Sequence, residues 1–197
     1  SSNVTVIDGT NNSTATVAAG TNPRAVAVNP VTNKIYVSNG VSNNVTVIDG
    51  TNNSTATVAS GTGPYAVAVN PVTNKIYVAN QNSANVTVID GTNNTTATVA
   101  AGTTPIALTL NPVTNKIYVA NENSANVTVI DGTNNTTATV AAGSTPFAVA
   151  VNPVTNKIYV ANQVSSNVTV IDGTNNSTAT VAAPFTPYAV EVNPATN

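Results

Sequence analysis

The amino-acid sequence predicts an all-β protein with one short structural unit repeated along its length. Three observations carry this prediction. First, the segment Asn-Val-Thr-Val-Ile-Asp-Gly recurs every 41 residues, without insertion or deletion, beginning at Asn3, Asn44, Asn85, Asn126 and Asn167. Second, each repeat alternates β-branched runs with Gly, Pro and Asn, which is typical of strands joined by turns. Third, no stretch shows the 3.6-residue period of an amphipathic helix.

Each repeat predicts four strands, which we call positions A to D. In the first complete repeat they are Pro23–Asn29 (A), Lys34–Ser38 (B), Asn44–Asp49 (C) and Thr55–Ala59 (D). Position A is continuously apolar with small residues, and position B carries the bulkier Ile-Tyr-Val. Positions C and D alternate Thr with Val, Ile or Ala. The segments between them contain the residues that favour tight turns.

Four antiparallel strands in 41 residues predict one blade of a β-propeller, whose best-known repeats have about 40–45 residues. Blades converge on a central axis, so the innermost strand must carry small residues and the outermost can be polar. This places position A innermost and position D outermost. A β-helical solenoid is the alternative, although its coils are usually shorter and lack three hairpins. We therefore predict a single β-propeller domain over residues 1–197, with about five blades.

The predicted strand count is uneven, because positions A, C and D occur five times and position B four times. The fifth position A, near Tyr188–Asn193, is expected to share a blade with Val4–Ala18 and so to close the ring, without a strand B between them. Open edges there invite pairing with another chain, although no copy has a spare strand B to donate. The uneven strand count and the Ser at position 1 favour the interpretation that the sequence is an excerpt of a longer repeat chain. A complete protein with a defective fifth blade is the alternative.

Two kinds of segment resemble the repeat of YVTN-family β-propellers. One is Tyr-Val-Ser-Asn at 36–39 with Tyr-Val-Ala-Asn at 77–80, 118–121 and 159–162, and the other comprises the flanking Ala-Val-Ala-Val-Asn-Pro and Asn-Val-Thr-Val-Ile-Asp runs. The resemblance covers essentially the whole chain, with Ser or Ala in place of the family's Thr. It implies an extracellular or cell-surface propeller, often in surface-layer or secreted bacterial and archaeal proteins, and no single activity. A designed or consensus protein is a further interpretation of such similar copies.

The amino-acid composition argues against several classes of function. Only 6% of residues are charged and the net charge is −2, so the basic footprint of nucleic-acid binding is absent. No apolar run reaches the eighteen or so residues of a membrane-spanning helix. The chain has no His, Cys, Met or Trp, which removes imidazole and thiol chemistry and the usual haem ligands. We expect no enzyme, no cofactor and no metal site, with the propeller part of a larger enzyme as the alternative.

The copies differ mainly on one predicted face. The A–B and C–D turns are nearly identical in every copy, whereas the D–A and B–C loops vary. Aromatic residues and Arg, which are enriched at binding hot spots, follow the loop proline in most copies. We predict a partner-binding rim around the channel mouth, formed by Arg24, Tyr65, Ile106, Phe147 and Tyr188. Neutral drift of loop residues is the alternative.

The function expected from these observations is a secreted structural or adhesive module of a microbial cell surface. Low net charge favours close packing into arrays, because little self-repulsion opposes it. The expected partners are further copies of the chain, other surface proteins or glycans. A glycan- or protein-binding propeller that acts through the variable loops is the alternative.

The C–D turns carry two further predictions. Antiparallel pairing of positions B and C should form ion pairs between lysine and aspartate, namely Lys34–Asp49, Lys75–Asp90, Lys116–Asp131 and Lys157–Asp172. Sequons of the type Asn-x-Ser/Thr also occur in these turns. In a cell that glycosylates exported proteins, we predict glycosylation at Asn12, Asn53, Asn94, Asn135 and Asn176.

Overall fold

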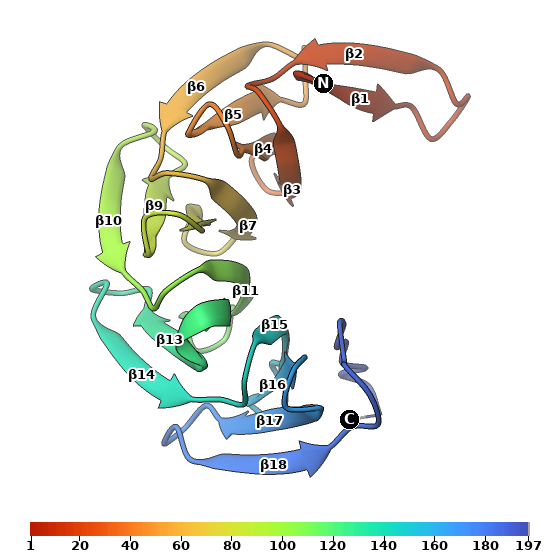
Figure 1. The fold of residues 1–197 in the computed structure, drawn as a ribbon. Helices are drawn as coiled ribbons and strands as arrows, with labels where there is room; N and C mark the ends of the chain where they lie inside the picture. Colours follow the sequence, from red (N-terminus) through yellow and green to blue (C-terminus); the bar gives the residue numbers. More distant parts are fainter. Residues whose placement is uncertain (197) are drawn as a thin grey trace.

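The computed structural model describes residues 1–196 and is all-β, as predicted. A two-stranded hairpin is followed by four four-stranded antiparallel sheets, in each of which consecutive strands are neighbours. The sheets follow one another along an arc (Figure 1). The sequence therefore predicted the β-propeller architecture and its four-stranded blades correctly.

The strand bounds agree with the predicted positions, except that strand B extends one residue further, to Asn39 in the first blade. Position A comprises β3 (Pro23–Asn29), β7 (Pro64–Asn70), β11 (Pro105–Asn111) and β15 (Pro146–Asn152). Position B comprises β4 (Lys34–Asn39), β8 (Lys75–Asn80), β12 (Lys116–Asn121) and β16 (Lys157–Asn162). Position C comprises β1 (Asn3–Ile7), β5 (Asn44–Asp49), β9 (Asn85–Asp90), β13 (Asn126–Asp131) and β17 (Asn167–Asp172). Position D comprises β2 (Thr14–Ala18), β6 (Thr55–Ala59), β10 (Thr96–Ala100), β14 (Thr137–Ala141) and β18 (Thr178–Ala182). A 3-10 turn, η1 (Glu122–Ser124), lies in the third B–C loop.

The order of side-chain sizes explains which strand lies where. The position A strands line the concave side of the arc, where β3, β7, β11 and β15 lie beside one another, and the position D strands form the outside (Figure 1). Small residues at position A let neighbouring sheets converge. The alternating Thr and Ala residues of β2, β6, β10 and β14 are exposed, while the Val between them packs inward.

The hydrophobic core consists of contacts between blades. Tyr36, Tyr77 and Tyr118 are fully buried, and each belongs to a cluster that includes residues of the next blade. Tyr36, for example, shares a cluster with Ile76, Val78 and Ile89. Tyr159 in the last complete blade is half-buried. The core therefore holds each sheet against the following one.

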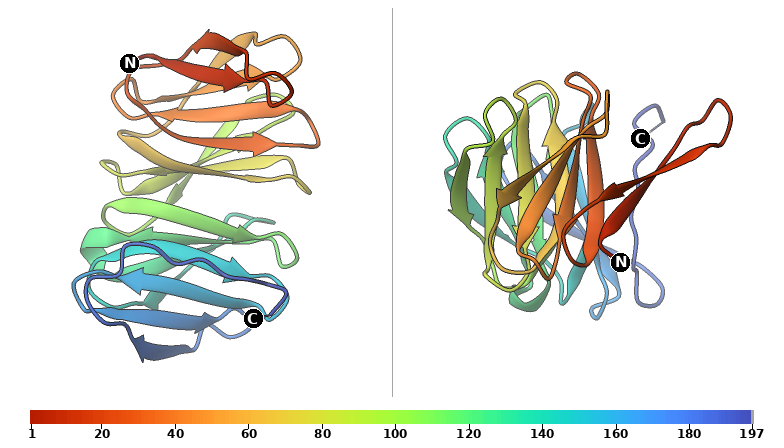
Figure 2. Two further views of the ribbon diagram at one scale, coloured as in Figure 1. Left: turned by 90° about the vertical axis from the view of Figure 1, so that its right-hand side faces the viewer. Right: turned by 90° about the horizontal axis from the view of Figure 1, so that it is seen from above.

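The predicted ring closure is wrong for the described residues. Tyr188–Asn193 forms no strand, and β1 pairs with β2 alone within residues 1–196. A position A strand pairs only with the strand B of its own blade, so this segment has no ladder partner within residues 1–196. The two ends of the chain consequently lie at opposite ends of the arc (Figures 1 and 2). Within the described residues, no helix is long and apolar enough to span a membrane.

Candidate functional site

The loop face is built from D–A and B–C loops that bond to each other. The Gly40 amide donates to the Asn22 carbonyl at 2.8 Å, and the Gln81 amide donates to the Gly63 carbonyl at 2.9 Å in the next repeat. In the first four D–A loops the residue before the proline is left-handed, with φ of 59° at Thr104 and 58° at Thr145. This conformation is strained for a β-branched residue and persists where the surroundings hold it. The backbone of these loops is thus held in a defined conformation.

A polar and aromatic cluster, which we call the Arg24 cluster, lies at one end of this face. The Arg24 guanidinium stacks over the Tyr65 ring, with its Cζ atom 4.8 Å from the ring centroid. Its Nη1 donates to Gln81 Oε1 at 3.0 Å. Asn22, Arg24 and Tyr65 line an open hollow of ≈ 440 Å³. The cluster therefore offers an aromatic ring, guanidinium donors and amide groups on one surface.

The Arg24 cluster depends on a small residue in the first B–C loop. A Cβ atom added to Gly40 would lie 2.5 Å from Arg24 Nε, so this glycine leaves room for the guanidinium stem. The other repeats carry Gln81, Glu122 and Gln163 at this position, and none of them has Arg after the loop proline. Comparison of the repeats at both positions together could have revealed the cluster from the sequence.

The other three residues of the predicted rim differ in their contacts and in their exposure to solvent. Phe147 and Tyr188 form an edge-to-face pair, with ring centroids 5.4 Å apart. Tyr188 is exposed, whereas Phe147 is half-buried. Ile106 departs from the expected rim, because it is only 5% exposed and therefore inaccessible to a partner. Burying an aliphatic side chain is favourable in free energy because apolar surface is removed from water. Arg and Tyr can bury their apolar part and still keep their polar end in water.

The opposite face is formed by the A–B and C–D turns. In each C–D turn the Asp caps the backbone, as in the bonds from the amides of Thr51 and Thr92 to Asp49 and Asp90 at 2.8 Å. These backbone bonds hold the pKa of both carboxyl groups below the ordinary value of 3.8. Each of these aspartates thus stabilises the turn in which it lies.

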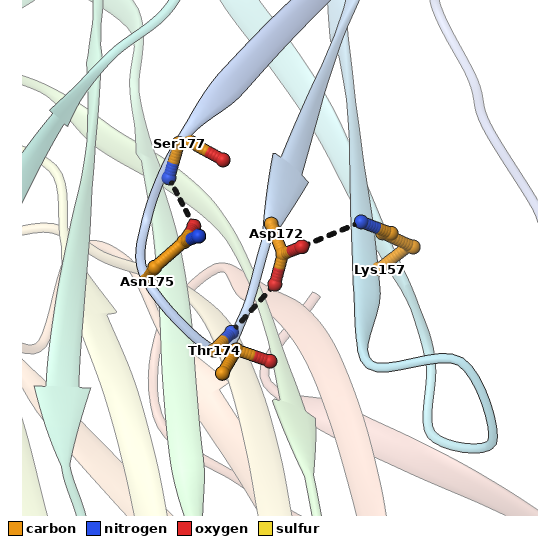
Figure 3. Close-up of polar contacts among 5 residues, drawn as sticks. All are labelled: Lys157, Asp172, Thr174, Asn175 and Ser177. Carbon is orange, nitrogen blue, oxygen red and sulfur yellow. Dashed lines mark hydrogen bonds and ion pairs between the residues drawn. The ribbon is translucent and has the colours of Figure 1, made fainter.

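The predicted ion pairs form in one blade of four among the described residues. Lys157 Nζ contacts Asp172 Oδ2 at 2.7 Å (Figure 3). In the other three blades the lysine donates instead to a glycine carbonyl in the next blade, with bonds of 2.9–3.0 Å from Lys34 to Gly91, Lys75 to Gly132 and Lys116 to Gly173. A carbonyl in the adjacent blade therefore displaces the expected carboxylate partner wherever that blade is present.

Removing the Lys157 ammonium group should change the titration of Asp172. Hydrogen bonds from Lys157, the largest cause, and from Thr174 together lower the pKa of Asp172 from 3.8 to about 2. Lys157→Met should therefore raise this pKa toward those of the other turn aspartates. Because the folded-state pKa is depressed, the pair stabilises the fold above pH 3.8, and this stabilisation is lost as the pH falls toward 2. NMR titration of the carboxyl carbons measures the change, and Asp90 is the internal control. An unchanged pKa of Asp172 would contradict the assignment.

The five turn sequons are not equally accessible. Their asparagines adopt left-handed φ values of 60–63°. Asn12 and Asn53 are exposed, whereas Asn94, Asn135 and Asn176 are half-buried, and the Oδ1 atoms of these three are buried. Packing against the preceding blade explains the difference, since Asn94 lies beside Lys34 and Asp49. Glycosylation remains a prediction, and the structure favours Asn12 and Asn53 as its sites.

Comparisons with known proteins support the fold. No protein-family model matches the chain, and no curated protein matches it. Among solved structures, hydrazine synthase of Kuenenia stuttgartiensis is similar, with a TM-score of 0.73 and 22% identity over 90% of this chain. A nidogen/laminin complex is also similar, with a TM-score of 0.72 and 11% identity over 98% of this chain and 79% of the other.

These likenesses concern the architecture alone. The chain spans 53% of the length of the hydrazine synthase chain that it matches. At such low identities, a shared β-propeller fold carries no information on substrate or partner. Among the described residues, no three His, Cys, Asp or Glu side chains gather as a metal site would require.

Proposed function

We propose that the chain is a non-catalytic structural and adhesive module of a microbial cell surface and that it binds glycans through the Arg24 cluster. The observation that carries this proposal is the Arg24–Tyr65 stack, with Gln81 bonded to the same guanidinium. An aromatic ring offers an apolar surface to a sugar ring, and guanidinium and amide groups bond hydroxyl oxygens.

The extracellular, surface-associated setting is supported by the sequence. The Tyr-Val-Ala-Asn repeats resemble those of YVTN-family propellers, and the small net charge of −2 permits close packing. The non-catalytic role is supported by the side chains at hand, because the chain has no His or Cys. The only two glutamates, Glu122 and Glu191, occupy different blade positions, so they do not form a pair of catalytic carboxylates.

Screening the labelled chain on a glycan array tests the proposal. We expect the wild type to bind a defined group of glycans and Tyr65→Ala or Arg24→Ala to weaken binding at least tenfold, because truncating a hot-spot residue costs about 2 kcal/mol or more. Val72→Ala is the matched control, since Val72 is 75% exposed on the opposite face. A triple alanine variant of Tyr65, Phe147 and Tyr188, compared with Tyr65→Ala alone, tests the remaining aromatic rim. If the wild type binds no array glycan, or if the Arg24 and Tyr65 variants bind normally, the proposal fails.

A further inference from the structure

The Arg24 cluster carries a positive charge that is not paired with an acidic side chain. Arg24 is the only arginine of the chain, and its guanidinium belongs to no ion pair among the described residues. The four lysines bond to acceptors on the opposite face, where three donate to glycine carbonyls and Lys157 contacts Asp172. Glu122 lies in a loop of the same face as Arg24, yet the two form no ion pair. The loop face therefore presents an unpaired cation.

Most hydrogen-bond donors of this guanidinium are free to bond a ligand. A guanidinium has five N–H donors and no acceptor. Its Nη1 donates to Gln81 Oε1 at 3.0 Å, and the guanidinium has no other acceptor in the part of the chain that the structure describes. The stack with Tyr65 uses a face of the guanidinium plane, whereas the N–H groups lie along its edge. Arg24 is exposed and lines the hollow of the cluster together with Asn22 and Tyr65.

Three neighbouring residues hold the guanidinium in place. Tyr65 and Gln81 belong to the following blade, and they contact a face and an N–H group of the guanidinium respectively. Gly40 leaves room for the stem, because a Cβ atom there would lie 2.5 Å from Arg24 Nε and 3.0 Å from Cδ. A guanidinium that is already oriented loses less conformational freedom when it binds a ligand. Its fork of N–H donors matches two oxygen atoms of one anionic group.

We infer that the glycans bound by this chain are acidic and that Arg24 binds their anionic group, which is the carboxylate of an acidic sugar or a sulfate ester. This inference rests on the proposed glycan-binding function. Two oxygen atoms of the anionic group accept N–H bonds from the edge of the guanidinium. The exposed part of Tyr65 and the Asn22 amide then contact the sugar ring and its hydroxyl groups. A neutral sugar leaves the charge unmatched, so the site selects acidic glycans over neutral ones.

Binding to chemically matched pairs of glycans tests this inference. The labelled wild type is screened on an array of uronic-acid, sialylated, sulfated and neutral oligosaccharides. Each acidic glycan that binds is then compared with the same glycan after carboxyl reduction or desulfation, which removes the charge and keeps the sugar backbone. We expect the affinity to fall about tenfold or more, because charge-assisted hydrogen bonds are about twice as strong as neutral ones. The treatment that abolishes binding identifies the anionic group as carboxylate or sulfate.

Three variants separate the charge of Arg24 from its position. Arg24→Gln removes the charge and keeps an amide donor, so it should bind an acidic glycan and its neutral counterpart equally. Gly40→Ala keeps the charge but displaces the guanidinium, so it should weaken acidic binding. Its circular dichroism should be unchanged, because the atoms it meets belong to the flexible Arg24 side chain. Lys157→Gln is the matched control, since it also changes the net charge of −2 by one unit but on the opposite face, and it should bind like the wild type.

Ionic strength gives an independent readout of the same contact. Raising the salt concentration from about 0.1 M to about 1 M shortens the Debye length from about 10 Å to about 3 Å, so acidic glycans should bind more weakly and neutral ones unchanged.

The outcomes distinguish this inference from the proposed function. Neutral counterparts that bind as tightly as acidic glycans, an Arg24→Gln variant that keeps the preference, a Gly40→Ala variant that binds like the wild type, or a Lys157→Gln variant that loses the preference would each overturn the inference and leave glycan binding itself intact. A wild type that binds no glycan of either kind would instead overturn the proposed function, and this inference with it.

Discussion

Replacing Tyr77 with alanine is expected to lower the free energy of unfolding by about 3–5 kcal/mol, the usual cost of truncating a buried aromatic residue. Tyr77 is fully buried in a cluster with Ile117, Val119 and Ile130 of the next blade. Removing its ring leaves a cavity between two sheets whose spacing is set by strand A contacts, so the site cannot collapse fully. Urea denaturation measures the loss.

Tyr77→Phe is the matched control for this substitution. The Tyr77 hydroxyl is buried and has no hydrogen-bond partner among the described residues. Removing it breaks no protein hydrogen bond, so we expect stability within about 1 kcal/mol of the wild type or above it. A loss as large as that of Tyr77→Ala would show that the hydroxyl, and not the packed ring, holds the blades together.

The loss of stability at alkaline pH provides a second test of the burial of Tyr77. Desolvation by burial raises the pKa of Tyr77 from 10.0 to about 12. Because the folded-state pKa is raised, the stabilising effect of the neutral phenol is present below pH 10.0 and is lost as the pH rises toward 12. The Tyr77→Phe variant should lose less stability over this interval than the wild type does.

Replacing Gly132 with alanine is expected to lower the free energy of unfolding by about 1–3 kcal/mol, as overpacking does. A Cβ atom at Gly132 would lie 2.8 Å from the backbone oxygen of Asn115, which also accepts the Gly132 amide hydrogen bond at 2.8 Å. Since a backbone atom cannot move aside cheaply, the A–B and C–D turns must separate. Thermal or urea denaturation measures the effect.

Gly9→Ala is the control, because Gly9 lies in the same Asp-Gly-Thr-Asn-Asn turn with no atom within 4 Å of its Cβ position. Gly9 is not among the residues with positive φ, so alanine fits its backbone. We expect unchanged stability or a gain of up to about 1 kcal/mol through the unfolded chain. Equal losses in the two variants would show that the turn conformation requires glycine, and not the contact between turns.

The strands and their order within a blade were predictable because they depend on neighbouring residues. The alternation in Val4-Thr5-Val6-Ile7 and the Asn-Pro-Val-Thr-Asn turns act over a few residues, and these local signals determine where each strand begins and ends. The constant 41-residue spacing then determined that every blade is alike. The variable loop face was also visible in the sequence.

The tertiary structure alone decided which partner each side chain takes across a blade junction. Lys34 and Asp49 are opposed in the strand register, yet Lys34 bonds Gly91, which is 57 residues away in the sequence. Ile106 matches Tyr65 in the repeat but is buried, and Tyr188–Asn193 matches a strand but finds no strand to pair with in the part of the chain that the structure describes. Identical repeats have identical local preferences, so only the presence or absence of an adjacent sheet distinguishes buried Ile48 from exposed Ile7.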